Sequence, residues 1–568
     1  MELAQARVDG DIPIFWTESG DELSAGLVFR VGFADEALAR HGITHLIEHL
    51  ALHRLGADAR LHYNGHVDGV ITTFVTRGSP QAVADFFTAV CASLRELPME
   101  RLEAEKQVLR TEADQRRPAI SDPLFAERYG ADTYGLTGFP EFGLGALQAD
   151  EVRAWTARYF TRGNAALWVA GGPPPSGLRL ELPDGATMPT PKPAHCESRT
   201  PGWVNAPVQG VGWSGLVRRS PAAQVYATVL SQRLMQELRH KQGLTYSPSV
   251  VYATRDRDMA HVIAATDGLE EVQSILVSAF IRELERLEAA GITDDELRAV
   301  IDKAAADAET VRGAAARVVG AAQNAIMGRP VASVASWRES LAALSVSDVH
   351  EVAKEAYESS LFVLPPRREP FRAGFTALGL PSGTAVSGRR IRSADYPLNQ
   401  ARLVIGEDGV SLVRGQAVDT VRYEECAVLL RWLDGGRQVI GRDGVVIRIE
   451  PTIWRLKDEA AQLEERVGAG HCATMPYRPS EGLPRPWTRR STRIAGWLLA
   501  GQTAAFLTGT LSVAALFLLV VLLAPSSVGF GAAILVWPMM GLGIANARLA
   551  RVRLLRRAAK RNAQRGYR

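Results

Sequence analysis

The feature that most constrains this chain is a five-residue segment, His45-Leu-Ile-Glu48-His49. Residues four apart lie on one face of an α-helix, so a helix here directs both imidazoles toward one point. Glu48 lies one turn from His45, within reach of a water molecule at that point. Two histidines and a carboxylate beside an open position suit catalytic zinc, and H-x-x-E-H reverses the H-E-x-x-H zinc motif. On these five residues alone, a histidine-rich helix face without a metal is an equal alternative.

A third ligand is expected on the helix predicted for 99–117, which is dense in Glu, Lys, Gln and Arg and bounded by prolines. Glu105 and Glu112 are about two turns apart, so they share one face of that helix. One carboxylate can bind a metal while the other orients a neighbouring ligand. The alternative for an acidic helix taken by itself is a solvated charged surface.

Two stretches of similar size show the same order of elements. In residues 1–172 the patterns predict strands at 12–16, 25–31, 69–76 and 164–170, with helices at 80–97, 99–117 and 149–159. In residues 201–365 they predict strands at 208–213, 249–254, 261–266 and 361–365, with helices at 222–241, 268–290 and 294–325. Pro- and Gly-rich linkers are expected at 173–200 and 366–398. This repetition indicates an internal duplication.

Residues 399–470 predict a small β domain. Apolar, β-branched runs alternate with Gly/Asp turns, and a helix is expected at 453–467. Several strands followed by a C-terminal helix resemble a pleckstrin-homology-like barrel.

The motifs in combination resemble the pitrilysin-type inverzincin zinc metallopeptidases, which include insulinase and the mitochondrial processing peptidase. H-x-x-E-H is followed some sixty residues later by an E-x6-E helix, and the segment 64–74 resembles the N-A-x-T…T-x-Y edge strand of that family. In the second half, the segment 239–247 resembles R-x-x-x-G-L-x-Y-S. The resemblance covers residues 5–365. Gly65 and Phe74 depart from it, since the family prefers Ala and Tyr there.

The resemblance implies an α+β chain with two homologous pitrilysin-type α/β domains. It implies Zn²⁺ bound by His45, His49 and Glu112, with Glu48 as general base and Glu105 orienting the ligands. It further implies that Asn64 and Thr72 bind substrate, and that Arg239 and Tyr246 stabilise the reacting group in the zinc site of a partner chain.

The expected activity is that of a zinc endopeptidase, cleaving peptides or leader segments inside a dimeric clamshell. The partner is expected to be a second copy or a related chain. The alternative is a catalytically minor or structural subunit of a peptidase-like membrane complex.

Residues 494–547 contain no Asp, Glu, Lys or Arg. That length accommodates two spans of about 20 residues, so a transmembrane hairpin is predicted, with a buried helix pair as the alternative. Arginines precede it, and the tail 548–568 is basic, so both ends are expected in the cytoplasm. No signal peptide is expected at the N-terminus. The prediction is a multi-pass inner-membrane protein, in contact with the lipid bilayer, whose peptidase domains face the cytoplasm.

The net charge of +3 arises from 65 basic and 62 acidic residues, which gives no strong global field toward nucleic acid. No nucleic-acid partner is therefore expected. The four cysteines lie far apart in the sequence and form no C-x-x-C pair, which favours reduced thiols.

Overall fold

The structure is a computed structural model. It describes residues 3–8, 12–18, 22–55, 62–116, 118–194, 200–370, 374–379, 383–396, 399–456 and 459–486. The chain forms two compact units. The first consists of Met1–Leu380 with the short segments Gly441–Gly444 and Gly470–Thr474, and the second contains the remaining residues.

The first half of the first unit is built on a six-stranded mixed sheet, with order β1-β2-β6-β3-β5-β4. Strands β2 and β6 are parallel, and the other neighbours are antiparallel. The strands are β1 (Ala4–Val8), β2 (Ile12–Thr17), β3 (Leu23–Phe29), β4 (His62–Val67), β5 (Thr72–Gly78) and β6 (Ala165–Ala170). The helices are α1 (Ile43–His53), α2 (Pro80–Arg95), α3 (Leu102–Gln115), α4 (Asp122–Tyr129) and α5 (Ala149–Tyr159).

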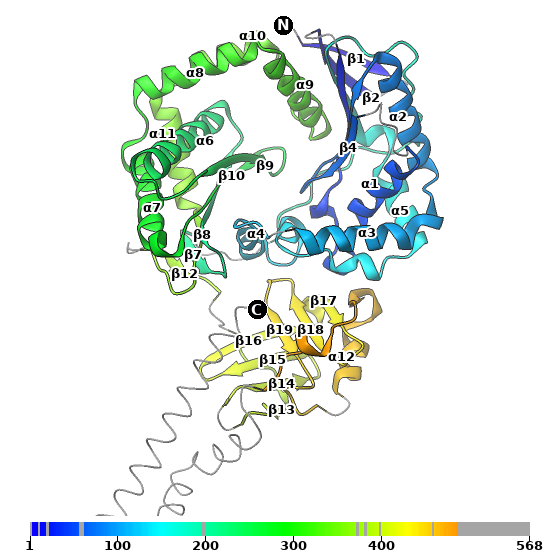
Figure 1. The fold of residues 1–568 in the computed structure, drawn as a ribbon, viewed down its shortest axis with the longest axis vertical. Coiled ribbons are helices and arrows are strands. Elements are labelled where there is room, and N and C mark those ends of the chain that lie inside the picture. The colour runs from blue at the N-terminus through cyan, green and yellow to red at the C-terminus, as the bar shows by residue number, and fades with distance from the viewer. Residues whose placement is uncertain are drawn as a thin grey trace, which may run out of the picture. The chain divides into compact units, whose positions relative to one another are not determined.

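The second half has a sheet of the same design, with order β12-β7-β11-β8-β10-β9, shown in green beside the blue first half in Figure 1. Its strands are β7 (Gly202–Asn205), β8 (Gly210–Arg218), β9 (Ser249–Thr254), β10 (Met259–Asp267), β11 (Leu361–Leu364) and β12 (Thr376–Ala377). Its helices are α6 (Pro221–Leu234), the π-helix η7 (Met235–Lys241), α7 (Gln273–Ala290), α8 (Asp294–Ala308), α9 (Val311–Ile326), α10 (Val334–Ala342) and α11 (Val346–Glu358).

Five of the six strands match one to one between the two sheets. In the first sheet β2 pairs in parallel with β6, and in the second β7 pairs in parallel with β11. The next strand of each sheet, β3 or β8, is antiparallel to β6 or β11. Only the sixth strand differs, because β1 precedes β2 in the chain whereas β12 follows β11. The topology therefore repeats in the two halves.

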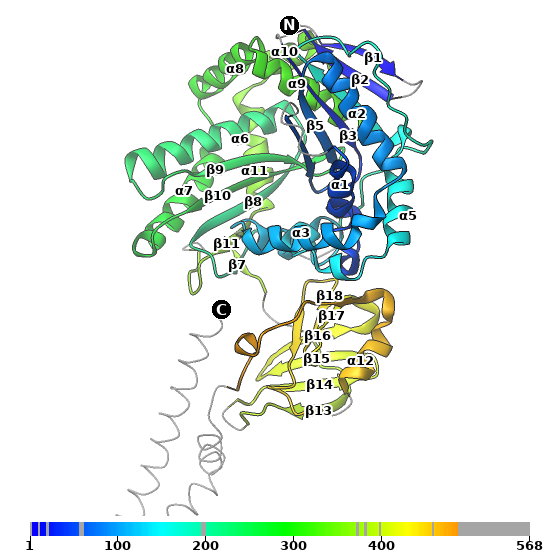
Figure 2. The same cartoon turned by 45° about the vertical axis from the view of Figure 1, so that its right-hand side comes forward.

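The first sheet is buried on both faces. On one face Ile12, Ile14 and Leu27 join a core with helices α1 and α2. On the other face Phe15 and Trp168 pack against α9, a helix supplied by the second half. Figure 2 shows α9 behind the first sheet, on the side opposite α1. Strand β4 lies at the edge of this sheet among the described strands.

Helix α9 is not the continuation of α8 that the sequence pattern predicted. The expected helix 294–325 is interrupted at Glu309 and Thr310. The Thr310 side chain accepts a hydrogen bond from the Gly313 backbone N–H, and a helix capped in this way starts anew. Likewise, the expected helix 222–241 becomes the π-helix η7 over its last seven residues.

The prediction of a pleckstrin-homology-like barrel finds no support in the described residues, whose strands do not close into a barrel. They form two four-stranded sheets, β13-β14-β15-β16 and β19-β18-β17-β20. Gly/Asp turns specify which neighbouring strands pair, but they do not determine whether the outer strands meet. The elements are β13 (Gly388–Arg392), β14 (Arg402–Gly406), β15 (Gly409–Arg414), β16 (Ala417–Arg422), β17 (Cys426–Arg431), β18 (Arg437–Gly441), β19 (Val446–Ile449), β20 (Cys472–Thr474) and α12 (Glu459–Val467).

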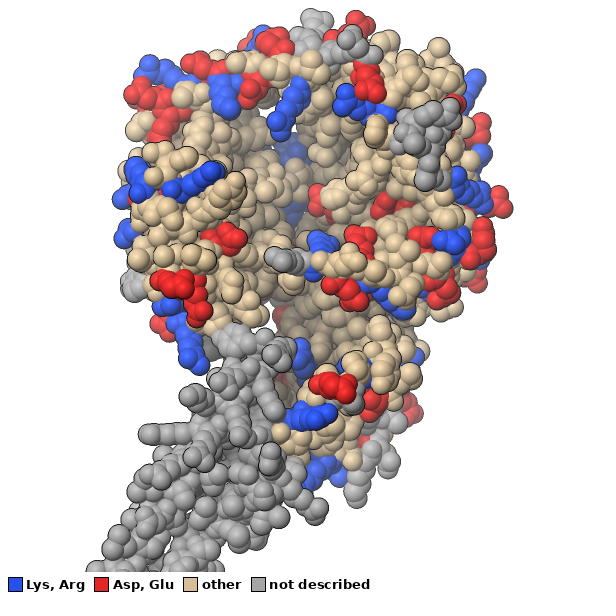
Figure 3. Space-filling view, in the orientation of Figure 1, with Lys and Arg blue, Asp and Glu red and all other residues tan. Residues whose placement is uncertain are grey.

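The predicted inner-membrane location is also corrected. Among the described helices, none combines the length and apolar character needed to cross a bilayer. Helix α7, with 18 residues, carries Arg282, Glu283, Glu285, Arg286 and Glu288 along its second half. The predicted hairpin 494–547 lies outside the described residues. On the face seen in Figure 3, basic and acidic side chains are interspersed.

His261 on β10 gives the first unit a specific acid sensitivity. Its ring is buried, with Nε2 2.8 Å from the Tyr129 hydroxyl, and burial together with Arg128 and Arg255 holds the pKa of His261 well below its ordinary value. As the pH falls, His261 is protonated in the unfolded chain before it is protonated in the folded one. The contribution of neutral His261 to the free energy of unfolding is therefore complete above about pH 6.5 and is lost as the pH falls. Between pH 7.5 and 5.5 the expected loss is about 1.4 kcal/mol.

Urea unfolding of wild type and His261→Gln at these two pH values measures this contribution. Glutamine still accepts a hydrogen bond from Tyr129 but does not titrate, so the variant should lose less stability in acid. An identical pH dependence in both proteins would show that His261 is not the sensitive group.

Candidate metal centre

Helix α1 has one buried, apolar face and one polar face. Leu46, Ile47 and Leu50 are fully buried in the core against the sheet, and His45 and His49 are partly exposed on another face. The helix begins after Gly42, whose φ of 103° is in the left-handed region that favours glycine. The core contacts therefore fix the rotation of α1 and point both histidines away from the sheet interior.

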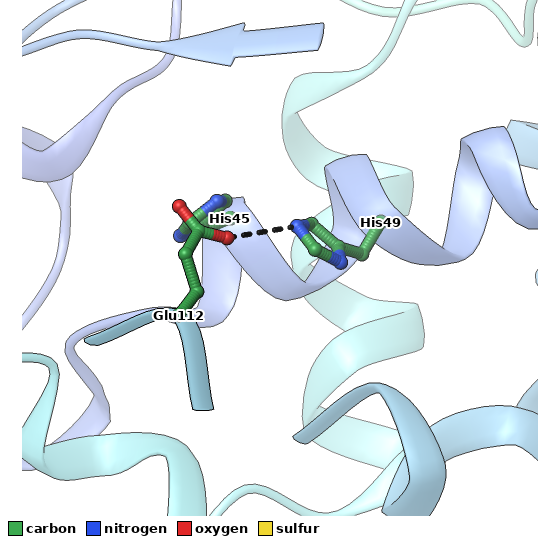
Figure 4. Close-up of side chains that lie close together, drawn as sticks. All are labelled: His45, His49 and Glu112. Carbon is green, nitrogen blue, oxygen red and sulfur yellow. Dashed lines mark ion pairs between the residues drawn. The ribbon is translucent and has the colours of Figure 1, made fainter. Parts of the chain in front are cut away.

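The three predicted ligands lie close together. Nitrogen atoms of His45 and His49 and a carboxylate oxygen of Glu112 all lie within 4.8 Å of one another. Figure 4 shows Glu112 approaching from another segment, with its carboxylate facing both rings, and His49 Nε2 lies 3.7 Å from Glu112 Oε2. In tetrahedral zinc sites the ligand atoms lie about 3.3–3.6 Å apart. Small side-chain rotations therefore suffice for these residues to hold a zinc ion.

The outer nitrogens of both rings face carboxylates. His45 Nδ1 lies 2.9 Å from Glu141 Oε1, and His49 Nδ1 lies 3.5 Å from Glu105 Oε2. Metal-binding histidines usually donate their second N–H to such a carboxylate, which fixes the tautomer and the ring orientation. This leaves Nε2 of each histidine for the metal, so the donor set fits zinc. Glu105 also reaches His53 Nδ1 at 3.5 Å.

Glu48 lies between α1 and the edge strand β4. Its Oε2 is 3.7 Å from His45 Nε2, and the residue is buried. A Cβ added to Gly65 on β4 would come within 1.9 Å of Glu48 Oε1, so alanine at this position would require the Glu48 side chain to move. Burial raises the pKa of Glu48 to about 7, which suits a group that accepts and returns protons near neutrality.

The two histidines differ in their electrostatics. Burial disfavours a charge on His45, but the hydrogen bond and charge of Glu141 more than offset this, and the pKa of His45 is raised. Burial and the charge of His45 lower the pKa of His49. A metal displaces protons from its ligands, so metal binding should weaken as the pH falls through the raised pKa of His45.

Arg239 and Tyr246 come together, but away from these ligands. The Arg239 guanidinium stacks over the Tyr246 ring at 4.8 Å, and Tyr246 is 80% exposed. Gly243, at φ 61°, ends the π-helix, and Leu244 turns inward while Tyr246 points to solvent. In the described residues, neither side chain has a recorded contact with His45, His49 or Glu112.

The two predicted substrate-binding residues differ in placement. Asn64 is exposed on β4. Thr72 is fully buried, and its hydroxyl donates a 2.9 Å hydrogen bond to the Val31 carbonyl. Thr72 therefore joins two segments of the backbone and presents no group to solvent.

Glu141 is the one residue of this cluster that the sequence analysis missed. It belongs to the short Pro140-Glu141 segment before a 3₁₀ turn and lies 96 positions from His45. No motif marks it among the chain's 62 acidic residues. The need for a carboxylate behind a metal-binding histidine was foreseeable, but its position depends on the fold.

Comparisons with known proteins place this geometry in a known fold. Residues 204–303 match the model of the Peptidase M16 inactive domain. A protease from Helicobacter pylori is 17% identical, over 64% of this chain and 99% of that one, with a TM-score of 0.53. The M16 inactive domain from Pseudomonas fluorescens is 13% identical, over 66% and 100%, also with 0.53. The fold is M16-like.

The Escherichia coli protein PqqL, described as a periplasmic protease, is 12% identical over 77% of this chain and 55% of its own, with a TM-score of 0.51. No curated protein matches the sequence. These likenesses establish the fold, whereas the chemistry depends on the residues of the cluster itself. The matched inactive-domain segment belongs to the second half and does not include His45, His49 or Glu112.

If His45, His49 and Glu112 hold zinc, replacing Glu141 with glutamine should weaken its binding by about 10- to 100-fold. The amide is a poorer acceptor for the His45 N–H and no longer balances a charge on that ring. Competition with a fluorescent chelator measures the affinity of purified protein. Glu151→Gln serves as a control, since Glu151 pairs with Arg40 at 2.7 Å and does not touch the histidines. Equal affinities for wild type and Glu141→Gln would show that the carboxylate has no influence on the site.

Proposed function

We propose that this chain is a zinc-dependent peptidase in which His45, His49 and Glu112 hold the metal. The observation that carries the proposal is the convergence of these three ligand atoms within 4.8 Å, with carboxylates behind both rings and Glu48 beside them. When bound, zinc lowers the pKa of a coordinated water and polarises a carbonyl.

Each residue has a distinct task in this proposal. Glu141 and Glu105 keep Nε2 of each histidine turned inward. Glu48 takes a proton from the attacking water and passes it to the leaving amine, as a carboxylate with a pKa of about 7 is able to do. Burial of Glu48 keeps solvent from competing for that proton.

Strand β4 supplies the place for a peptide. It is one of the two outer strands of its sheet among the described strands, and Gly65 on it touches Glu48. An extended peptide adding to this edge pairs its backbone with β4 and passes beside the carboxylate. The substrate class is therefore unfolded peptides or leader segments.

Arg239 and Tyr246 are proposed to act in a second chain, either a copy of this one or a relative. Their exposure and mutual stacking leave a cation and a phenol available to a neighbouring molecule. Such groups stabilise negative charge that develops on a carbonyl oxygen.

A second candidate function is that of a non-catalytic, structural subunit. The comparisons taken alone support it better, because the segment that matches a family model is the inactive M16 domain. The complete ligand set in the first half favours catalysis.

Hydrolysis of a quenched, unstructured peptide by the purified chain distinguishes a zinc-dependent peptidase from a non-catalytic subunit. The proposal predicts cleavage that a chelator abolishes and that added zinc restores. Absence of chelator-sensitive cleavage, alone and with candidate partner chains, would leave the structural subunit as the function.

A further inference from the structure

A buried ion pair lies just before the metal-binding helix and has no part in the proposed chemistry. His41 Nδ1 is 2.6 Å from Glu36 Oε2, and both side chains are almost completely excluded from solvent. The Phe33 ring packs edge-on against the His41 ring at 5.3 Å. Burying such a pair is costly unless its remaining polar atoms are also satisfied.

Glu36 satisfies its remaining oxygen sites at the start of α1. Its carboxylate accepts hydrogen bonds from the Gly42 N–H at 2.8 Å and from the Thr44 N–H at 2.9 Å. The first N–H groups of a helix have no partner within the helix, and a carboxylate there also suits the helix dipole. Glu36 therefore anchors the turn that immediately precedes His45.

His41 also contacts the segment that carries Glu141. Its Nε2 lies 3.3 Å from the Phe139 carbonyl oxygen, two residues before Glu141. Both ring nitrogens face acceptors, so an imidazole that donates on both sides bridges the Glu36 carboxylate and the 139–141 segment. One connected set of contacts thus runs from the start of α1 to the carboxylate that holds His45 Nδ1.

We propose that Glu36 and His41 are positioning residues for the metal centre: they fasten the start of α1 to the 139–141 segment, so that Glu141 meets His45 and the metal-facing nitrogen is aimed correctly. Neither residue touches the ligand atoms. The inference rests on the proposed zinc function, and it adds that metal affinity depends on residues that act through Glu141.

A double-mutant cycle on zinc affinity tests this action. His41→Ala should weaken binding of Zn²⁺ on the order of tenfold in the wild-type background. In the Glu141→Gln background, where the contact that His41 supports is already impaired, the same change should cost less than about twofold. A residue that merely stabilises the fold gives equal losses in both backgrounds.

Two further variants keep the test decisive. His41→Gln carries both its N–H donors on one nitrogen and cannot bridge acceptors that face two different ring nitrogens. Glu36→Gln offers one acceptor oxygen where three N–H groups need partners. Each variant should therefore reproduce part of the loss if His41→Ala does not fold. Tyr129→Phe removes a different buried contact to a histidine and should lower stability without changing zinc affinity.

Unchanged zinc affinity in folded His41 and Glu36 variants would overturn the positioning role, and so would equal losses in the two backgrounds. Neither result would contradict the proposed zinc site of His45, His49 and Glu112. A wild-type chain that takes up no zinc would instead overturn the proposed function and this inference together.

Discussion

Glu48→Gln is expected to lower kcat for peptide hydrolysis by about 10²- to 10⁴-fold while zinc remains bound. Glutamine has the shape of glutamate, so it fits the space beside Gly65 and leaves the ligand atoms of His45, His49 and Glu112 in place. The amide, however, accepts no proton near neutral pH, and the proton of the attacking water has no carboxylate to receive it. Rates with a quenched peptide, measured beside metal content, separate catalysis from binding.

Glu100→Gln is the matched control, since Glu100 is exposed at the start of the 3₁₀ turn before α3. It should retain the wild-type rate and zinc content. A Glu48→Gln protein that cleaves as fast as wild type would exclude Glu48 as the base. A variant that loses its zinc would show that Glu48 is needed to form the site.

Arg239→Ala is expected to lower activity by about 10²- to 10³-fold, and mixing it with the Glu48→Gln chain should restore part of it. If Arg239 and Tyr246 serve the zinc site of the partner, a mixed dimer contains one site with both a wild-type Glu48 and a wild-type Arg239. Random pairing of equal amounts then gives about a quarter of the wild-type rate. Each variant alone remains at its low rate.

The exposed position of the pair makes this experiment feasible. Tyr246 is 80% exposed and holds Arg239 by stacking, so substitution there does not disturb the core. Arg257→Ala, at another exposed arginine, is the control for the loss of a surface charge. Mixed dimers that form but show no recovery would contradict action across the chains.

The sequence predicted those features that depend on local spacing. The i and i+4 histidines required a helix, and α1 places both on one face; the bounds of α5 and β9 agree with their patterns. The E-x6-E spacing placed Glu105 and Glu112 on the side of α3 that faces α1. The spacing within each helix was foreseeable because it spans about two helical turns, whereas the meeting of α1 with Glu112 was expected only from the family resemblance.

Features that depend on long-range contact were not foreseeable. Glu141 meets His45 across 96 positions, and His41 meets Phe139 across 98. Thr72 matched a motif, but it is buried because β5 lies between β3 and β4 and the Thr72 hydroxyl bonds to the distant Val31 carbonyl. Turn residues suggested a barrel for residues 399–470, but the described strands of this region belong to two sheets. Local patterns do not determine how edges meet or which distant carboxylate reaches a histidine.

The zinc content of the purified chain beside that of Glu112→Ala tests the account most directly. Glu112 is 55% exposed at its side chain and contacts His49 at 3.7 Å, so its loss should remove a ligand without harming the fold. We predict one zinc ion per wild-type chain and strongly reduced zinc in Glu112→Ala under the same dialysis. A wild-type chain without zinc, or equal zinc in both proteins, would contradict a metal centre at His45, His49 and Glu112.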